Sequence, residues 1–325
     1  MRAVQLHNFG DADELFIGDV PSPIRKPGEV LVQVHASALN RADLMQRQGK
    51  YPPPEGESDI LGLEMAGEVV DSDSGSQWLK GNKVMGLLPG GGQAELVSVP
   101  EKQLMPIPNK LNFTEAAAIP EVFLTAYQTL FYEGKAKSGQ TALIHAGASG
   151  VGTAAIQLAG IENIKSFVTC SASKHQTCLD LGAFHAIDYK NEAFDKVVLE
   201  MTDAKGVNII LDFIGAPNLE PNIRSLANGG KLMMIAFMGG FNAVDINLLP
   251  ILQKHLTITG TTLRSRPLEY KAALIKGFID KYLQHFESGK LRPVIDSIYS
   301  LDDIADAHRY MEANKNTGKI IIEIG

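Results

Sequence analysis

From Thr141 onward the chain repeats one pattern: a short apolar run followed by a helical segment. Each run is too short for a buried helix and is rich in Val, Ile and Leu or Met, which is typical of strands covered on both faces. The runs lie at residues 141–147, 165–171, 186–189, 207–215, 231–239 and 256–263. Strands that alternate with helices need right-handed crossovers, so this region predicts a parallel, doubly wound α/β sheet.

The first run enters a glycine cluster that reads Gly147-Ala-Ser149-Gly150-Val151-Gly152. In a Gly-x-Gly-x-x-Gly turn the glycines permit the bend, the approach of a pyrophosphate and the packing of helix on strand. Ser149 takes the middle place, where its hydroxyl can donate to a phosphate oxygen. A strand precedes this turn and a helix follows it to about residue 160, which favours dinucleotide binding over a structural turn without ligand. The predicted contacts come from Ser149, Gly150, Val151 and Gly152.

The end of the second run bears on which dinucleotide is bound. NAD sites usually carry an Asp or Glu there, bonded to the ribose 2′-hydroxyl. This chain has Ser171, Ser173 and Lys174 instead, and no carboxylate between residues 171 and 175. Ser171, Lys174 and, after the third run, Tyr189 would surround a 2′-phosphate, so we predict NADPH as the cofactor. The alternative for Lys174 is an ordinary solvated helix residue.

The first 120 residues have a different sequence pattern, with short β segments separated by Gly and Pro. The segments 29–39, 64–72 and 82–99 predict a small, irregular β-barrel. A helix is expected to begin at Thr114 as N-cap and to be divided by Pro120.

A long amphipathic segment, 268–291, follows the α/β region, and the chain closes on an apolar strand near residues 318–324. That strand has no partner nearby in sequence, so we expect it to return to the N-terminal domain. The expected domains are residues 1–121, 122–264 and 265–325, the last returning to the first.

Composition limits the class of protein. The formal net charge of -7 argues against a nucleic-acid surface. The longest apolar runs are too short to span a bilayer, and the N-terminus lacks the apolar core of a signal peptide. Only two cysteines occur, which fits a reducing cytoplasm and does not fit a disulfide scaffold. We therefore expect a cytoplasmic protein with no membrane partner.

Five segments resemble the zeta-crystallin-like quinone oxidoreductases, the zinc-free branch of the medium-chain dehydrogenase/reductase superfamily. They are "SALNRADLMQRQGKYPPP", "ILGLEMAGEVV", "LLPGGGQAELVSVP", "AAAIPEVFLTAYQTL" and "YMEANKNTGKIIIEI". They occur in order, and the resemblance extends over nearly the whole chain. The resemblance implies a GroES-like β domain and a Rossmann domain, with the active site in the cleft between them. It also implies a homodimer formed through the edge of the Rossmann sheet, with residues 231–237 or 256–262 as the edge strand.

Zinc-dependent relatives hold their catalytic metal with a Cys in the segment matching "ALNRADL" and a His in the one matching "GLE". Asn40 and Leu63 stand at those places, and no cysteine precedes Cys170 to build the structural zinc lobe. We therefore predict no metal, and alcohol oxidation is not expected without a Lewis acid. Quinones are already electrophilic, so NADPH-dependent quinone reduction is the predicted activity, with no dedicated catalytic acid. The alternatives are reduction of the double bond of a 2-alkenal or enone, and a non-enzymatic, crystallin-like protein that binds NADPH or RNA.

The resemblance assigns catalytic places to Tyr51 and Asn40, both near the nicotinamide, and a cofactor contact to Thr125. The alternatives are a surface tyrosine packed on proline and a helical threonine bonded to its own backbone. Asp43 and Glu64 are expected either beside the site or in structural pairs with Arg41 or backbone amides. The ends of the fifth and sixth runs add Phe237, Met238, Leu263 and Arg264 as residues lining the cofactor, with core packing as the alternative for Phe237 and Leu263. His145 is expected to be a structural histidine.

Overall fold

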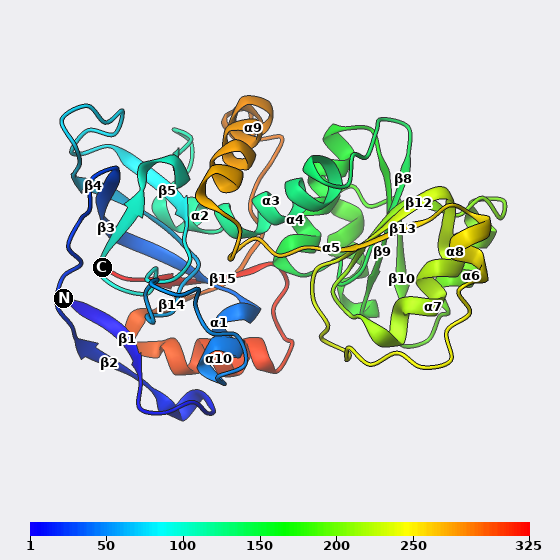
Figure 1. Cartoon of the computed structure of the whole chain (residues 1–325), viewed down its shortest axis with the longest axis horizontal. Coiled ribbons are helices and arrows are strands. Elements are labelled where there is room, and N and C mark those ends of the chain that lie inside the picture. Colours follow the sequence, from blue (N-terminus) through cyan, green and yellow to red (C-terminus); the bar gives the residue numbers. More distant parts are fainter. The chain divides into compact units, whose positions relative to one another are not determined.

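The computed structural model describes all 325 residues as two compact units. One comprises Met1–Leu124 together with Leu263–Gly325, and the other, Thr125–Thr262, is inserted between those segments (Figure 1). Leu263 and Arg264, which we assigned to the Rossmann segment, therefore belong to the first unit. No helix in either unit combines the length and the apolar character needed to cross a membrane.

The first unit is built on a seven-stranded sheet in the order β14-β15-β3-β4-β5-β7, with β6 paired to β3. Its strands are β3 (Glu29–Leu39), β4 (Glu64–Asp71), β5 (Lys83–Leu87), β6 (Leu96–Pro100), β7 (Leu104–Pro106), β14 (Ile295–Ser300) and β15 (Lys319–Glu323). A separate antiparallel pair is formed by β1 (Arg2–Leu6) and β2 (Leu15–Asp19). The β segments expected before residue 100 are present.

The C-terminal strand β15 lies inside this sheet, between the edge strand β14 and β3. It pairs antiparallel with β3, with Ile320 opposite Leu39, and parallel with β14. In Figure 1 this red strand runs beside blue β3. Its three isoleucines, Ile320 to Ile322, are fully buried. The apolar run that lacked a local partner thus finds one about 280 residues away, as expected.

Five α-helices begin in the first unit: α1 (Arg41–Arg47), α2 (Phe113–Ala117), α3 (Pro120–Tyr127), which continues into the second unit, α9 (Leu268–Glu287) and α10 (Ile304–Glu312). Three 3₁₀ turns accompany them: Ala12–Glu14, Glu101–Gln103 and Leu301–Asp303. The division at Pro120 is confirmed, since α2 ends before it and α3 starts on it.

The N-cap expected at Thr114 is wrong. Asn112 caps α2, because its side chain accepts a hydrogen bond from the Glu115 amide at 2.8 Å. The Glu115 carboxylate in turn accepts one from the Asn112 amide at 3.0 Å. This reciprocal pair satisfies two amides of the first turn, which a cap at Thr114 would leave unpaired.

The second unit contains a six-stranded sheet in the order β10-β9-β8-β11-β12-β13, and every neighbouring pair is parallel. The strands are β8 (Thr141–Ile144), β9 (Lys165–Cys170), β10 (His185–Asp188), β11 (Val207–Asp212), β12 (Leu226–Met234) and β13 (Thr257–Gly260). The helices are α4 (Gly150–Ile161), α5 (His175–Asp180), α6 (Phe194–Met201), α7 (Ala216–Ser225) and α8 (Leu249–Gln253), with a π-helical turn at Gln128–Tyr132 and a 3₁₀ turn at Ala172–Lys174. This is the strand order of dinucleotide-binding sheets, and it confirms the predicted Rossmann topology.

The order also decides between the two candidate edge strands. β12 has partners on both sides, β11 and β13, whereas β13 pairs only with β12. The edge on this side is therefore β13, which contains residues 257–260. β12 ends at Met234, so Phe237 and Met238 lie beyond the strand rather than at its end, and they are 51% and 53% exposed. Core packing does not account for either side chain.

Candidate active site

The glycine turn of the second unit presents free donors at the start of a twelve-residue helix. Ser149 is the N-cap of α4, and its hydroxyl oxygen accepts a hydrogen bond from the Gly152 amide at 3.1 Å. The amides of Gly150 and Val151 have no acceptor within the chain. They point out of the positive end of the helix, where an anion is stabilised. The O–H of Ser149 also remains available to donate.

Two positions in this turn have room only for glycine. A Cβ on Gly147 would lie 2.6 Å from the Val168 side chain on β9, and one on Gly152 would lie 2.4 Å from the Ala146 carbonyl oxygen. The bend itself is taken by Ala146, whose φ is 51°. Gly147 therefore serves close packing rather than the sharp turn that the spacing suggested. The turn is therefore tightly packed, as glycine turns that bind a dinucleotide pyrophosphate are.

The end of β9 carries hydroxyls and a cation, and no carboxylate follows it directly. The Ser171 and Ser173 hydroxyl oxygens lie 3.4 Å apart, and Lys174 ends the short turn before α5. Tyr189, after β10, is 56% exposed. The sequence reasoning missed His175, whose Nε2 is buried without a hydrogen-bond partner in the chain. An unpaired buried nitrogen in this loop is a further group that a ligand can satisfy.

One acid stands near this loop, at the end of the neighbouring strand. Asp188 on β10 is in register with Cys170 on β9. Its carboxylate accepts hydrogen bonds from the Asn191 side chain at 2.6 Å and the Lys190 amide at 3.2 Å, and the Asn191 bond holds the pKa of Asp188 below its usual range. The carboxylate is thus engaged by its own loop.

His145 is a structural residue, as expected. It is fully buried at the end of β8, with Nδ1 2.9 Å from the Thr169 hydroxyl and Nε2 2.7 Å from the Asn222 side-chain oxygen. Burial lowers the pKa of this imidazole. Both ring nitrogens have partners, which leaves none for a ligand.

Thr125, on α3, has a buried hydroxyl with no hydrogen-bond partner in the chain. The reading of Thr125 as a helical threonine bonded to its own backbone is therefore wrong. One turn later Thr129 does make that bond, donating to the Thr125 carbonyl at 2.7 Å. A buried hydroxyl left unpaired costs free energy unless a ligand or water satisfies it, so Thr125 fits a cofactor contact.

In the first unit a buried network centres on Glu64. The Lys319 ammonium lies 2.7 Å from one Glu64 oxygen, and the Asn40 side-chain amide donates to the same oxygen at 2.9 Å. The other oxygen accepts the Glu121 amide at 2.8 Å. Lys319 donates in addition to the Asn40 side-chain oxygen at 2.7 Å. The Asn40 amide is thereby held rigidly from both sides by charged groups.

Asp43 adds a second buried carboxyl beside this network. It accepts hydrogen bonds from the Asn40 and Gly62 backbone amides at 2.7 and 2.9 Å. Burial raises the pKa of Asp43 to about 6, although the two backbone hydrogen bonds act to lower it. Asp43 does not pair with Arg41, which instead bonds the Asn314 side chain. The expected alternative of a carboxylate held by backbone amides is thus the one observed.

Glu121 is the functional candidate that the sequence reasoning missed. It lies in the first turn of α3, directly after Pro120. Burial raises the pKa of this carboxyl to about 7, and the charge of Glu64 raises it further, while Lys319 and Arg264 oppose the shift. A carboxylic acid with a pKa near neutrality can release and regain a proton during turnover. The visible signal was an acid in the otherwise apolar stretch "AAAIPEVFL".

Tyr51 and Arg264 form one group in the first unit. The Arg264 guanidinium lies over the Tyr51 ring, 5.3 Å from its centroid. It donates to the Pro89 carbonyl at 2.6 Å, the Gln46 side chain at 2.6 Å and the Tyr51 carbonyl at 3.3 Å. Arg264 therefore links the loop that contains Tyr51 to Gln46 and Pro89. Leu263, next to it, is buried.

Burial raises the pKa of Tyr51, as does the nearby charge of Glu121, while Arg264 lowers it. The first unit thus brings Asn40, Tyr51 and Glu121 into one electrostatic neighbourhood. No group of three or more His, Cys, Asp or Glu side chains in the chain has a metal-binding arrangement.

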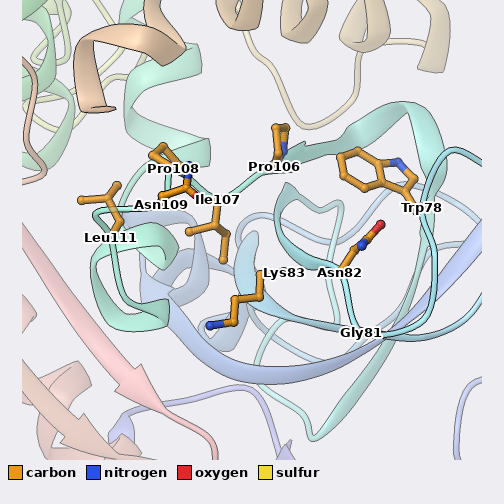
Figure 2. A pocket seen from close by; sticks show the side chains of 9 residues that line it. All are labelled: Trp78, Gly81, Asn82, Lys83, Pro106, Ile107, Pro108, Asn109 and Leu111. Carbon is orange, nitrogen blue, oxygen red and sulfur yellow. The ribbon is translucent and has the colours of Figure 1, made fainter. Parts of the chain in front are cut away.

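A separate pocket of about 580 Å³ lies elsewhere in the first unit (Figure 2). Figure 2 shows Trp78, Lys83 and Pro106 among its lining residues. The Trp78 indole donates to the Glu101 carbonyl at 3.0 Å, and the Lys83 ammonium lies 5.4 Å from the Phe113 ring centroid. Its polar groups serve the fold, and none of the expected site residues lines it.

Comparison with known proteins agrees with this architecture. Residues 26–109 match the "Alcohol dehydrogenase GroES-like domain" family and residues 181–322 the "Zinc-binding dehydrogenase" family. The chain is 32% identical to the human synaptic vesicle membrane protein VAT-1 homolog, over all of this chain and 87% of the relative. The chain belongs to the medium-chain dehydrogenase/reductase superfamily. As a member, it is a nicotinamide-dependent oxidoreductase, and the predicted GroES-like and Rossmann pair is confirmed.

Two further likenesses within the superfamily carry enzyme names. Human quinone oxidoreductase is 31% identical, over 99% of this chain and 97% of the relative. The crystal structure of the JamJ enoyl reductase superposes with a TM-score of 0.88 at 25% identity, over 100% of this chain and 99% of that one. The superfamily thus offers two reductive chemistries for comparison with the site.

Proposed function

We propose that this protein is an NADPH-dependent reductase of quinones. The observation that carries the proposal is the end of β9, where Ser171, Ser173 and Lys174 stand in place of a carboxylate. A carboxylate would repel a 2′-phosphate, whereas hydroxyls and an ammonium group bind it. The free amides at the start of α4 would hold the pyrophosphate.

The proposed cofactor contacts come from the groups described above. Ser149, Gly150, Val151 and Gly152 form the pyrophosphate turn, and Ser171, Lys174 and Tyr189 receive the 2′-phosphate. Thr125, Asn40 and Tyr51 would meet the nicotinamide end, and Phe237 and Met238 are exposed apolar groups available to it. We propose a different role for Arg264, whose donors fix the tyrosine loop rather than a ligand.

A reduced nicotinamide, when bound, supplies a hydride equivalent to an electron-poor acceptor. From the sequence we expected no dedicated acid; we now propose that the chain both holds the acceptor and provides the proton that completes its reduction. Glu121 fits the second task, because its pKa of about 7 leaves a large part of the population protonated at neutral pH. Lys319 and Glu64 hold the side-chain amide of Asn40 in one orientation. Asn40 would therefore place a rigid polar group beside the nicotinamide ring.

The second candidate is reduction of an activated carbon–carbon double bond. The likeness to an enoyl reductase favours it, and so does Glu121, because an enolate carbon needs a placed acid more than a hydroquinone oxygen does. Quinone reduction remains first because the relative named for it matches the whole chain at higher identity.

Steady-state turnover separates the two candidates. The purified chain, supplied with NADPH, is assayed with an ortho-quinone and with a 2-alkenal of similar size. We expect the quinone to be reduced with the larger kcat/KM. A larger kcat/KM for the alkenal would favour double-bond reduction as the function. Turnover of neither substrate would contradict both candidate functions.

We also propose that the protein is a cytoplasmic homodimer assembled through β13. The exposed edge strand is preceded in the chain by apolar side chains that a monomer would leave in water. Apart from Phe237 and Met238, which we propose at the cofactor, they are Phe241, Val244, Leu248, Leu249 and Leu252. Sedimentation of a particle with the mass of one chain would contradict this assembly.

A further inference from the structure

The only two cysteines of the chain lie in contact with each other. Cys170 is the last residue of β9 and Cys178 is in α5. Their sulfur atoms are 3.7 Å apart, and the two residues are 4% and 0% exposed. Neither thiol takes part in the proposed catalysis or cofactor binding.

The contact links both ends of the loop that carries the proposed 2′-phosphate groups. Residues 171–177 connect the two cysteines and include Ser171, Ser173 and Lys174. A disulfide bond requires a sulfur–sulfur distance of about 2.05 Å. Closing the 3.7 Å contact would therefore draw α5 toward the end of β9 and shift the turn between them.

The surroundings make one thiol the better nucleophile. The hydrogen bond from the Cys178 thiol lowers the pKa of Cys170, an effect that burial and Asp188 oppose and Lys174 assists. The same contact and burial raise the pKa of Cys178. These directions favour Cys170 as the attacking thiol and Cys178, 3.7 Å away, as the resolving thiol.

We propose that Cys170 and Cys178 are a reversible oxidation site for hydroperoxides, and that the disulfide formed there weakens binding of the NADPH 2′-phosphate. The Cys170 thiolate attacks the peroxide oxygen and becomes a sulfenic acid, while the peroxide's O–O bond breaks and releases an alcoholate that takes up a proton. The Cys178 thiol then attacks the sulfenic sulfur, and water leaves as the S–S bond forms. Two electrons pass from the thiols to the peroxide, and a dithiol reductant restores both thiols.

This inference uses the proposed NADPH function for its binding consequence only. The oxidation itself is followed by mass spectrometry, on the full chain treated with hydrogen peroxide and then alkylated. We expect the peptides of Cys170 and Cys178 to become cross-linked, and dithiothreitol to reverse the link. Both thiols staying free, or becoming over-oxidised without a cross-link, would overturn the site.

The binding consequence is measured by titrating reduced and oxidised protein with NADPH and with NADH. We expect oxidation to weaken NADPH by about tenfold, the scale of one lost charge-assisted bond, and to change NADH much less. An unchanged NADPH affinity in fully cross-linked protein would refute the coupling. If reduced protein binds no NADPH, the proposed function fails, while the cross-link still decides the oxidation site.

Two single-cysteine variants separate the effect of the disulfide from other effects of peroxide on the protein. Cys178→Ser keeps the attacking thiol and removes the resolving one, so peroxide should oxidise Cys170 without a cross-link. Cys170→Ser should leave Cys178 almost unreactive. Peroxide should then have no dithiothreitol-reversible effect on NADPH binding in either variant, and such an effect in either one would contradict the proposed pair.

Discussion

Replacing Glu121 with Gln should make the protein more stable at neutral and alkaline pH while it loses activity. The change removes a carboxyl whose pKa burial raises from 4.5 to about 7 in the folded chain. That displacement corresponds to about 3 kcal/mol of unfavourable free energy in the ionised form. Glutamine has a similar shape and carries no charge, so it should relieve this penalty.

The sign of the pH dependence follows from the proton balance. Below about pH 4.5 the carboxyl is protonated in both folded and unfolded chains, so its contribution to stability is fully present. Between about 4.5 and 7 the folded chain holds the proton more tightly, and stability falls as pH rises through that interval. The stability difference between Glu121→Gln and the wild type should therefore be small at pH 4.5 and approach about 3 kcal/mol at about pH 8.

Urea unfolding at both pH values, followed by circular dichroism, measures this difference. Asp43 also titrates in the interval, with a pKa of about 6, but it is present in both proteins and largely cancels. Glu200→Gln, on the exposed face of α6, is the matched control and should change stability at neither pH. Equal or lower stability of Glu121→Gln at the higher pH would refute the reasoning.

The same variant tests the proton role. Loss of a general acid typically lowers kcat by about 10²-fold or more, and we expect a fall of that order. In the wild type kcat should decline as pH rises through about 7, and in Glu121→Gln that decline should be absent. A variant with wild-type kcat and an unchanged pH profile would show that the proton comes from elsewhere.

Three further substitutions test the cofactor site. Lys174→Ala should weaken NADPH by roughly 1.5–3 kcal/mol and leave NADH nearly unchanged in calorimetric titration, whereas equal losses would remove Lys174 from phosphate recognition. Gly152→Ala places a Cβ 2.4 Å from the Ala146 oxygen, so it should lower unfolding stability by about 1–3 kcal/mol and abolish dinucleotide binding; an unchanged melting temperature would contradict the packing argument. Thr125→Val removes a hydroxyl that has no partner in the chain, so NADPH binding should weaken by about 1 kcal/mol without a loss of stability, and weaker folding would imply an internal bond.

Features set by local patterns were predictable from the sequence. The alternation of apolar runs and helices after Thr141 is a local signal, and it predicted the parallel, doubly wound sheet that is observed. The glycine spacing likewise identified the start of α4. The return of β15 could be inferred because an apolar strand without a nearby partner must find one elsewhere.

Features set by distant contacts were not predictable. Glu121 owes its raised pKa to burial beside Glu64, 57 residues away, and no local pattern contains that information. Arg264 was expected at the cofactor because it follows a strand, but its donors reach Gln46, Tyr51 and Pro89 in the N-terminal segment of its own unit. The N-cap was misplaced because Thr114 and Asn112 are both good caps, and only the reciprocal bond with Glu115 decides between them.

Parallel titrations of the reduced full chain with NADPH and NADH, followed by the fluorescence of the reduced nicotinamide, test the central claim most directly. The free amides of α4 and the cation after β9 predict saturable binding of both, with NADPH tighter by at least about tenfold. Equal affinities, tighter NADH or no saturable signal would contradict a site built for the phosphorylated cofactor.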